Sequence, residues 1–99
     1  MTARILKHFE FEDEQKSRQN PELFDLEMTK GDVVVIDLKY KKKVRLFIAC
    51  PRCGISSFTG THKINVEDNV VSAHPSLVMQ CCGWHGWLKK NKFSGDGII

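Results

Sequence analysis

The stretch CPRCG, residues 50–54, decides the fold, because it holds two cysteines separated by two residues and followed directly by a glycine. This spacing lets the chain turn so that both sulfur atoms face one point. The glycine permits the backbone conformation that such a turn requires. The pattern is typical of a zinc knuckle, and it predicts that a second knuckle elsewhere in the chain completes a tetrahedral metal site.

The second knuckle is predicted in the stretch CCGWHG, residues 81–86, which repeats the form of the first with histidine in the second ligand position. Keeping the two-residue spacer and a following glycine, Gly86, selects Cys82 and His85. Cys81 breaks this register, and we expect it to be a small buried hydrophobic residue at the end of a strand. One zinc ion per chain is therefore expected, with the ligands Cys50, Cys53, Cys82 and His85.

Four protein ligands close a zinc site, so the predicted metal is structural rather than catalytic. Its thiolates leave a net negative charge, which we expect Arg52 and either Lys89 or Lys90 to offset. Nothing in the sequence assembles a catalytic triad, a framed pair of carboxylates or a phosphate-binding glycine loop. We therefore expect a protein that is not an enzyme. The remaining histidines lack a partner at ligand spacing and are expected on the surface: His8, His62 and His74.

Iron is the alternative to zinc at the same four residues. The second stretch resembles the Cys-x-x-His-Gly box of Rieske proteins, and that resemblance implies a small iron–sulfur electron-transfer protein. The first stretch differs from the Rieske pattern, which has Cys-x-His where this chain has Cys50-Pro51-Arg52-Cys53. Thioredoxin-like redox chemistry at Cys50 and Cys53 is disfavoured, because no helix is expected after the motif.

Strand patterns surround both cysteine stretches. The β-branched run 33–38 and the run 44–49, which leads into Cys50, predict a hairpin joined by the basic loop 39–43. A second hairpin is expected around the turn Asp68-Asn69. We expect Pro75 to break the hydrogen-bonded ladder, with a further strand at 77–80.

The chain divides into three predicted parts. Residues 1–30 form an acidic arm with modest helical content, since Glu12 and Lys16 are spaced for a helical ion pair. Residues 31–93 form a zinc-ribbon-like domain, and residues 94–99 form a flexible tail. The predicted fold class is mainly β: a small zinc-ribbon-like antiparallel sheet with an N-terminal, partly helical arm.

Basic residues concentrate after residue 39, and acidic residues concentrate between residues 9 and 32. The basic side chains are expected to form one cationic face, on which Tyr40, Trp84 or Trp87 could stack on unpaired bases. The alternatives are a solvated hairpin tip, an acidic arm that lies on the basic face and cancels its charge, and tryptophans that serve only in packing. The candidate binding residues are Lys39, Tyr40, Lys41, Lys42, Lys43, Arg45, Lys89, Lys90 and Lys92.

A hydrophobic strand that enters a Cys-Pro-x-Cys-Gly knuckle resembles the zinc-ribbon class. More narrowly, residues 31–93 resemble a family of small proteins encoded by phages and mobile elements. Three short matches carry the likeness: Cys50-Pro51-Arg52-Cys53-Gly54, Pro75-Ser76-Leu77 and Cys82-Gly83-Trp84-His85-Gly86-Trp87. The resemblance implies the fold much more than a function.

These patterns predict a non-enzymatic zinc-binding module that binds a macromolecule and regulates or inhibits it. The expected partner is nucleic acid or a nucleic-acid-binding protein complex, and the acidic arm would suit the second by mimicking phosphate charge. No apolar run approaches the roughly 18 residues of a membrane span, so we expect no membrane contact. A cytoplasmic protein is expected, in the host cytoplasm if the chain is phage-encoded, and a reducing compartment favours metal ligands over disulfides.

Overall fold

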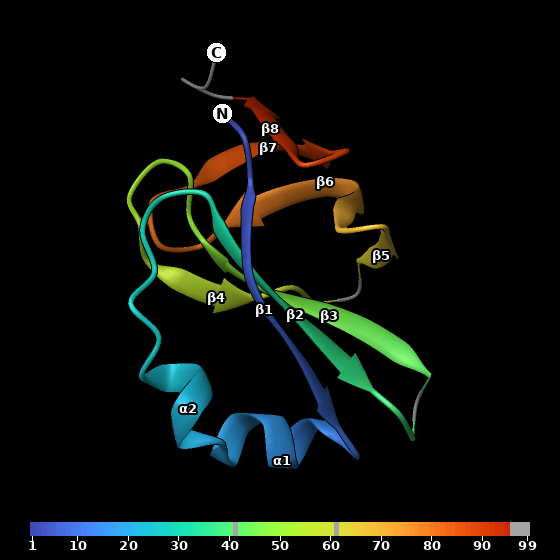
Figure 1. Ribbon diagram of the computed structural model, residues 1–99. Coiled ribbons are helices and arrows are strands. Elements are labelled where there is room, and N and C mark those ends of the chain that lie inside the picture. The colour runs from blue at the N-terminus through green and yellow to red at the C-terminus, as the bar shows by residue number, and fades with distance from the viewer. Residues whose placement is uncertain (41, 61, 96–99) are drawn as a thin grey trace.

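The computed structural model describes residues 1–40, 42–60 and 62–95. The fold is mainly β, as expected, with two four-stranded sheets and two short helices (Figure 1). Neither helix, in the part of the chain that is described, has the length and apolar character needed to cross a lipid bilayer. The elements are β1 (Arg4–Phe11), α1 (Glu14–Gln19), α2 (Pro21–Phe24), β2 (Asp32–Leu38), β3 (Lys43–Ala49), β4 (Ser56–Phe58), β5 (Lys63–Glu67), β6 (Val70–Met79), β7 (Trp84–Lys89) and β8 (Lys92–Gly95).

The first sheet has the order β1-β2-β3-β4. The predicted hairpin is confirmed, since β2 and β3 pair antiparallel from Val33 opposite Ile48 to Leu38 opposite Lys43. Strand β1 pairs parallel to β2 on the other side. Because β2 has neighbours on both edges and is covered on both faces, it is buried along almost its whole length, which explains its nearly uninterrupted run of apolar residues.

The second sheet has the order β5-β6-β7-β8, and all of its pairs are antiparallel. The predicted turn is confirmed: Asp68 and Asn69 join β5 to β6 with φ angles of 51° and 62°, the left-handed values that a tight hairpin turn requires. Pro75 does not end the strand as expected. It lies within β6, where the register with β7 shifts between Ala73 and Leu77.

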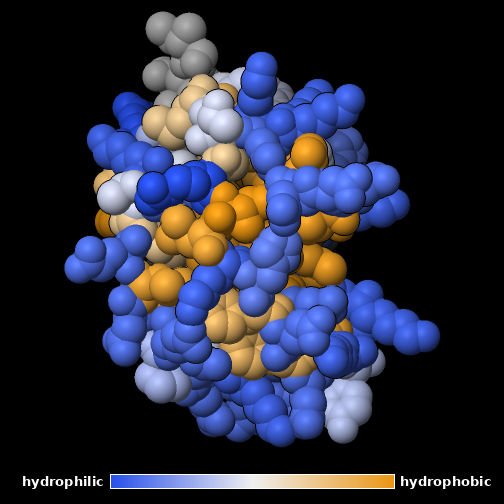
Figure 2. Space-filling model, viewed as in Figure 1, coloured by the Kyte–Doolittle hydropathy of each residue, from blue (hydrophilic) through white to orange (hydrophobic). Residues whose placement is uncertain are grey.

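The two sheets face each other across one hydrophobic core. Strands β2 and β3 contribute Val33, Val35, Leu46 and Ile48, and the second sheet contributes its inward residues, among them Trp84. A second core, which includes Leu23, lies on the opposite face of the first sheet under the α1–α2 segment. The view in Figure 2 shows apolar atoms in a band across the middle of the molecule, with hydrophilic side chains above and below.

Residues 1–30 are expected from the sequence to form a separate arm, but part of this segment belongs to the sheets and their core. Strand β1 comes from this segment, Ala3 is buried in the core between the sheets, and Thr2 forms a bridge with Lys92 of the second sheet. The helical expectation for the segment is met only by the short α1 and α2. At the other end, Ser94 and Gly95 belong to β8, so the tail expected at 94–99 begins inside a strand and otherwise lies outside the described residues.

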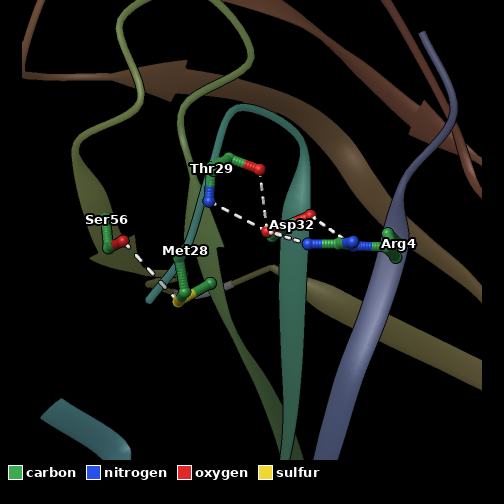
Figure 3. A network of polar contacts seen from close by, with 5 residues as sticks. All are labelled: Arg4, Met28, Thr29, Asp32 and Ser56. Carbon is green, nitrogen blue, oxygen red and sulfur yellow. Dashed lines mark hydrogen bonds and ion pairs between the residues drawn. The ribbon is translucent and has the colours of Figure 1, made fainter. Parts of the chain in front are cut away.

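A buried carboxylate fixes the entry to β2 (Figure 3). Asp32 accepts hydrogen bonds from Arg4 Nε and Nη2, each at 3.0 Å, and from the backbone N and Oγ1 of Thr29, at 2.8 and 3.1 Å. Its side chain is 4 % exposed. Burial alone would raise the pKa of Asp32, but the bonds from Arg4 and Thr29 outweigh that effect and hold the pKa below its usual value. This network links β1 to β2 and fixes the turn before β2.

Candidate metal centre

The first cysteine turn connects β3 to β4. Cys50 directly follows the last residue of β3 and is fully buried, whereas Cys53 is exposed. The turn is closed by a hydrogen bond of 2.9 Å from the Gly54 backbone N to the Cys50 carbonyl oxygen. Gly54 has a φ of 86°, a conformation that L side chains rarely adopt. The expected role of the glycine in this turn is therefore confirmed.

The second cysteine turn connects β6 to β7 and has the same hydrogen bond. The Gly83 backbone N donates to the Met79 carbonyl oxygen at 2.8 Å, and Gly83 has a φ of 76°. Gly83 thus matches Gly54, and Cys82 matches Cys53. The residue that matches Cys50 is Met79, so the second turn presents its sulfurs from adjacent residues, Cys81 and Cys82.

The two turns bring all four cysteines of the chain together at the left side of the molecule in Figure 1. Their Sγ atoms lie within 4.8 Å of one another. Contacts across the two turns are 3.6 Å from Cys50 to Cys82 and 2.9 Å from Cys53 to Cys81, and the Sγ atoms of Cys81 and Cys82 are 3.9 Å apart. No disulfide joins these cysteines. This group could hold a metal ion.

The thiols of this group change one another's pKa through their hydrogen bonds. A hydrogen bond with Cys81 and a backbone hydrogen bond from Ile55 lower the pKa of Cys53 to about 7. The hydrogen bond with Cys53 and burial raise the pKa of Cys81 to about 12. Burial raises the pKa of Cys82, against a backbone hydrogen bond from Trp84.

The backbone bonds to sulfur repeat the symmetry of the turns. Cys53 receives its bond from the residue two positions later, Ile55, and Cys82 receives its bond from the residue two positions later, Trp84. In both turns the bond stabilises the negative form of the sulfur. The pKa is nevertheless lowered only for Cys53, because burial outweighs this bond at Cys82.

The structure brings together three of the four predicted ligands and places Cys81, rather than His85, beside them. Cys81 is exposed, so the expectation of a buried hydrophobic residue is wrong. His85 lies on β7 and points outward, with its Nε2 atom 3.0 Å from Ser76 Oγ. The sequence prediction of His85 relied on Gly86, which lies within β7 and not in a turn.

Gly86 is a packing residue inside β7. A Cβ atom added there would overlap the carbonyl oxygen of Ser94 and the indole ring of Trp84. The absence of a side chain at Gly86 leaves room for the indole ring of Trp84, which is fully buried. The requirement for glycine at this position therefore comes from the core, whereas Gly83 is the glycine of the second cysteine turn.

The basic residues near the cysteines differ partly from those expected. Arg52 lies in the first cysteine turn, between Cys50 and Cys53, and is exposed. The Lys30 side chain also passes this turn, since its Cγ would lie 3.6 Å from a Cβ added to Gly54. Lys89 ends β7, roughly 17 Å along the strand from the second turn at about 3.3 Å per residue. Lys89 and Lys90 are therefore too far away to offset charge at the cysteines.

The candidate binding residues do not form one face. Those of the β2–β3 turn lie at the lower right in Figure 1, and the β7–β8 turn with Lys89, Lys90 and Lys92 lies at the top. Arg45 is half-buried within β3, and Lys41 lies outside the described residues. The β2–β3 turn also meets acidic neighbours, because Lys39 Nζ lies 3.0 Å from Glu10 Oε2. Part of the acidic segment therefore does lie beside the basic loop.

The two tryptophans have different environments. Trp84 is fully buried and packs edge-on against Phe93 with ring centroids 6.1 Å apart, so its expected packing role is confirmed. Trp87 is 42 % exposed and lies beside the ring of His85. Among the other histidines, His8 and His74 are exposed and His62 is half-buried, with its Nε2 atom 2.9 Å from the Ser76 carbonyl oxygen.

Comparison of the chain with known protein families, with curated proteins and with solved structures gave no match.

Proposed function

We propose that the four cysteines bind one structural Zn²⁺ and that the protein is a non-enzymatic module that binds a macromolecule and regulates or inhibits it. The observation that carries the proposal is the gathering of four thiol sulfurs within 4.8 Å. A tetrahedron with Zn–S bonds of about 2.3 Å has edges of about 3.8 Å. The Cys50–Cys82 and Cys81–Cys82 separations of 3.6 and 3.9 Å are close to that edge, whereas the Cys53–Cys81 separation of 2.9 Å is shorter and would have to widen around an ion.

The sulfur separations favour a single ion over an iron–sulfur cluster. A cluster stands between its thiolates and holds them further apart than one ion does. A Rieske-like centre would also use His85, whose Nε2 atom contacts Ser76 instead. Thiolates are soft ligands that suit zinc, and four of them leave no open position for water or substrate. These points support a structural metal and a role other than catalysis.

The proposed ion would tie two hairpins together. One turn belongs to the β3–β4 hairpin of the first sheet and the other to the β6–β7 hairpin of the second. Two hairpins that share one ion through their turns are the arrangement of a zinc ribbon, so the geometry supports the likeness expected from the sequence. Lys30 and Arg52 would balance part of the negative charge of four thiolates.

The proposed partner is nucleic acid or a protein that handles nucleic acid. The support is the charge of strands β6 to β8, since residues 69–95 contain Lys89, Lys90 and Lys92 and no acidic residue. The phage-type resemblance and the cytoplasmic location stay predictions from the sequence.

Metal analysis of the purified full chain tests the proposal. We expect a colourless protein with about one zinc per chain. Binding to the folded state alone stabilises a protein by about 2.7 kcal/mol when the free ligand is 100-fold above Kd. Removal of zinc with EDTA should therefore lower the melting temperature by roughly 10–20 °C for a domain of this size. A brown protein that contains iron, or a protein whose melting temperature is the same after EDTA, would contradict the proposal.

A further inference from the structure

The outer face of the second sheet is a separate surface from the cysteine group. Burial alternates along β7: Trp84, Gly86 and Leu88 face the core, so His85, Trp87 and Lys89 face outward. The neighbouring strands place other residues on this same outer face. They are Lys63 and Asn65 of β5, Ser72, Ser76 and Val78 of β6, and Lys92 and Ser94 of β8.

Two aromatic rings lie side by side on this face. The ring centroids of His85 and Trp87 are 5.5 Å apart, with an interplanar angle of 37°. Val78, which pairs with His85 across β6 and β7, is 63 % exposed. Most large apolar side chains of a folded domain are covered, so Trp87 and Val78, both exposed and both next to His85, mark a surface suited to a flat, apolar ligand.

Small and basic side chains surround the rings. Trp87 lies opposite Ser94 on β8. Because the serine side chain is small, it leaves the indole ring accessible to a ligand. Lys89 and Lys92 face each other at the end of the same hairpin, and Lys63 lies on β5 at the other edge of the sheet. Glu67 is an acidic residue on this face. It lies at the opposite end of β5 from Lys63, and the β5–β6 turn that follows it is hydrogen-bonded to the β7–β8 turn, since Asn91 Nδ2 donates to the Asn69 carbonyl oxygen at 2.9 Å.

We propose that this outer face of the second sheet binds single-stranded nucleic acid, with bases stacked on Trp87 and His85 and phosphates held by Lys63, Lys89 and Lys92. Unpaired bases expose the aromatic faces that such stacking needs, and lysines beside the rings attract the backbone. The inference rests on the proposed function for its partner class, and it selects nucleic acid over a protein partner.

The β2–β3 turn is the natural comparison, because Tyr40 is 76 % exposed among lysines. There, however, Lys39 pairs with Glu10, and the Tyr40 backbone N donates to the backbone carbonyl oxygen of Glu12, so this turn lies against the acidic segment that follows β1. Negative charge repels phosphate. Tyr40 is thus a matched control: an exposed aromatic residue beside lysines that should not contribute to binding.

Fluorescence anisotropy with labelled 15-nucleotide oligo-dT and oligo-rU tests the inference on zinc-loaded protein at about 50 mM salt. Stacking contributes about 1–3 kcal/mol per base, so Trp87→Ala should weaken binding about 5- to 150-fold. Trp87→Phe should restore most of the loss, and Tyr40→Ala should change nothing. The double change of Lys89 and Lys92 to alanine should reduce the salt slope of log K by about 1.4.

Zinc content and melting temperature of every variant separate this inference from the proposed function. If Trp87→Ala proves unstable, His85→Ala, which alters an exposed side chain, provides the same test. Absence of oligonucleotide binding by a zinc-containing wild-type protein would overturn the inference and leave the metal site standing. A loss of oligonucleotide affinity with Tyr40→Ala equal to that with Trp87→Ala would also overturn the inference. So would the finding that this face binds a protein and no oligonucleotide.

Discussion

The Sγ atom of Cys53 lies 2.9 Å from the Sγ atom of Cys81, although the two residues are 28 positions apart. The contact joins the turn after β3 to the turn after β6, and therefore joins the two sheets at one end of their shared core. A metal held here would fasten together two halves of the fold that otherwise meet through the apolar core and the backbone bridge between Thr2 and Lys92. The fourth ligand is the point on which the structure and the sequence pattern disagree.

Cys81→Ser should lower zinc affinity by at least about 100-fold, because losing a ligand costs more than losing a residue that only orients one. His85→Ala is the matched control and should leave the affinity unchanged. Competition with a chromophoric zinc chelator measures both. A large loss with His85→Ala and none with Cys81→Ser would restore the register expected from the sequence.

Zinc affinity should fall as the pH falls. Zinc binds thiolates. The pKa of Cys81 is raised to about 12 and the pKa of Cys82 is also raised, so near neutral pH each of these two thiols must release a proton when zinc binds. The pKa of Cys53 is lowered to about 7, so above pH 7 this residue binds zinc without releasing a proton. The pH slope of log Kd should therefore steepen by about one proton below pH 7. Chelator competition from pH 6 to pH 8 measures the slope, and a flat profile would show that thiols are not the ligands.

Asp32 should make the fold sensitive to acid. Its folded-state pKa is lowered, so it contributes stability above its ordinary pKa of about 4 that is lost as the pH falls through the lower folded value. Asp32→Asn should destabilise the protein at pH 7 by about 1–3 kcal/mol and flatten the decline between pH 4 and pH 2. Urea unfolding across this range measures both effects. Asp25→Asn, at an exposed carboxyl, should keep the wild-type decline; identical curves for the two variants would contradict this role of Asp32.

Gly86→Ala should destabilise the fold by about 1–3 kcal/mol or more, because the added methyl group meets the backbone of β8 and the ring of Trp84. Gly60→Ala is the control, since a Cβ there has no neighbour within 4 Å. Thermal melting compares them. If both alanines melt like the wild type, Gly86 is not the packing residue that the structure indicates.

The hairpins could be predicted from the sequence because their signals are local. A β-branched run, a basic loop and a second apolar run define β2 and β3, and Asp68-Asn69 marks the turn between β5 and β6. Strand β1 could not be predicted in this way. Its register with β2 shifts between Ile5 and Lys7, which breaks the alternation of side chains, and its pairing partner lies far along the chain.

The cysteine register was predictable in principle from the glycines. Both real turns contain a Cys-Gly pair, Cys53-Gly54 and Cys82-Gly83, and in both the glycine has a positive φ. The prediction instead matched Gly54 with Gly86, because it kept the two-residue spacing between ligands. Spacing alone could not show that Gly86 is required for packing against Trp84, a contact that exists only in the folded core.

X-ray absorption at the zinc edge of the purified protein tests the central claim most directly, because it counts the ligand atoms around the metal. The account predicts four sulfur atoms at about 2.3 Å. Three sulfur atoms with one nitrogen at about 2.0–2.1 Å would contradict it and return the fourth ligand to His85.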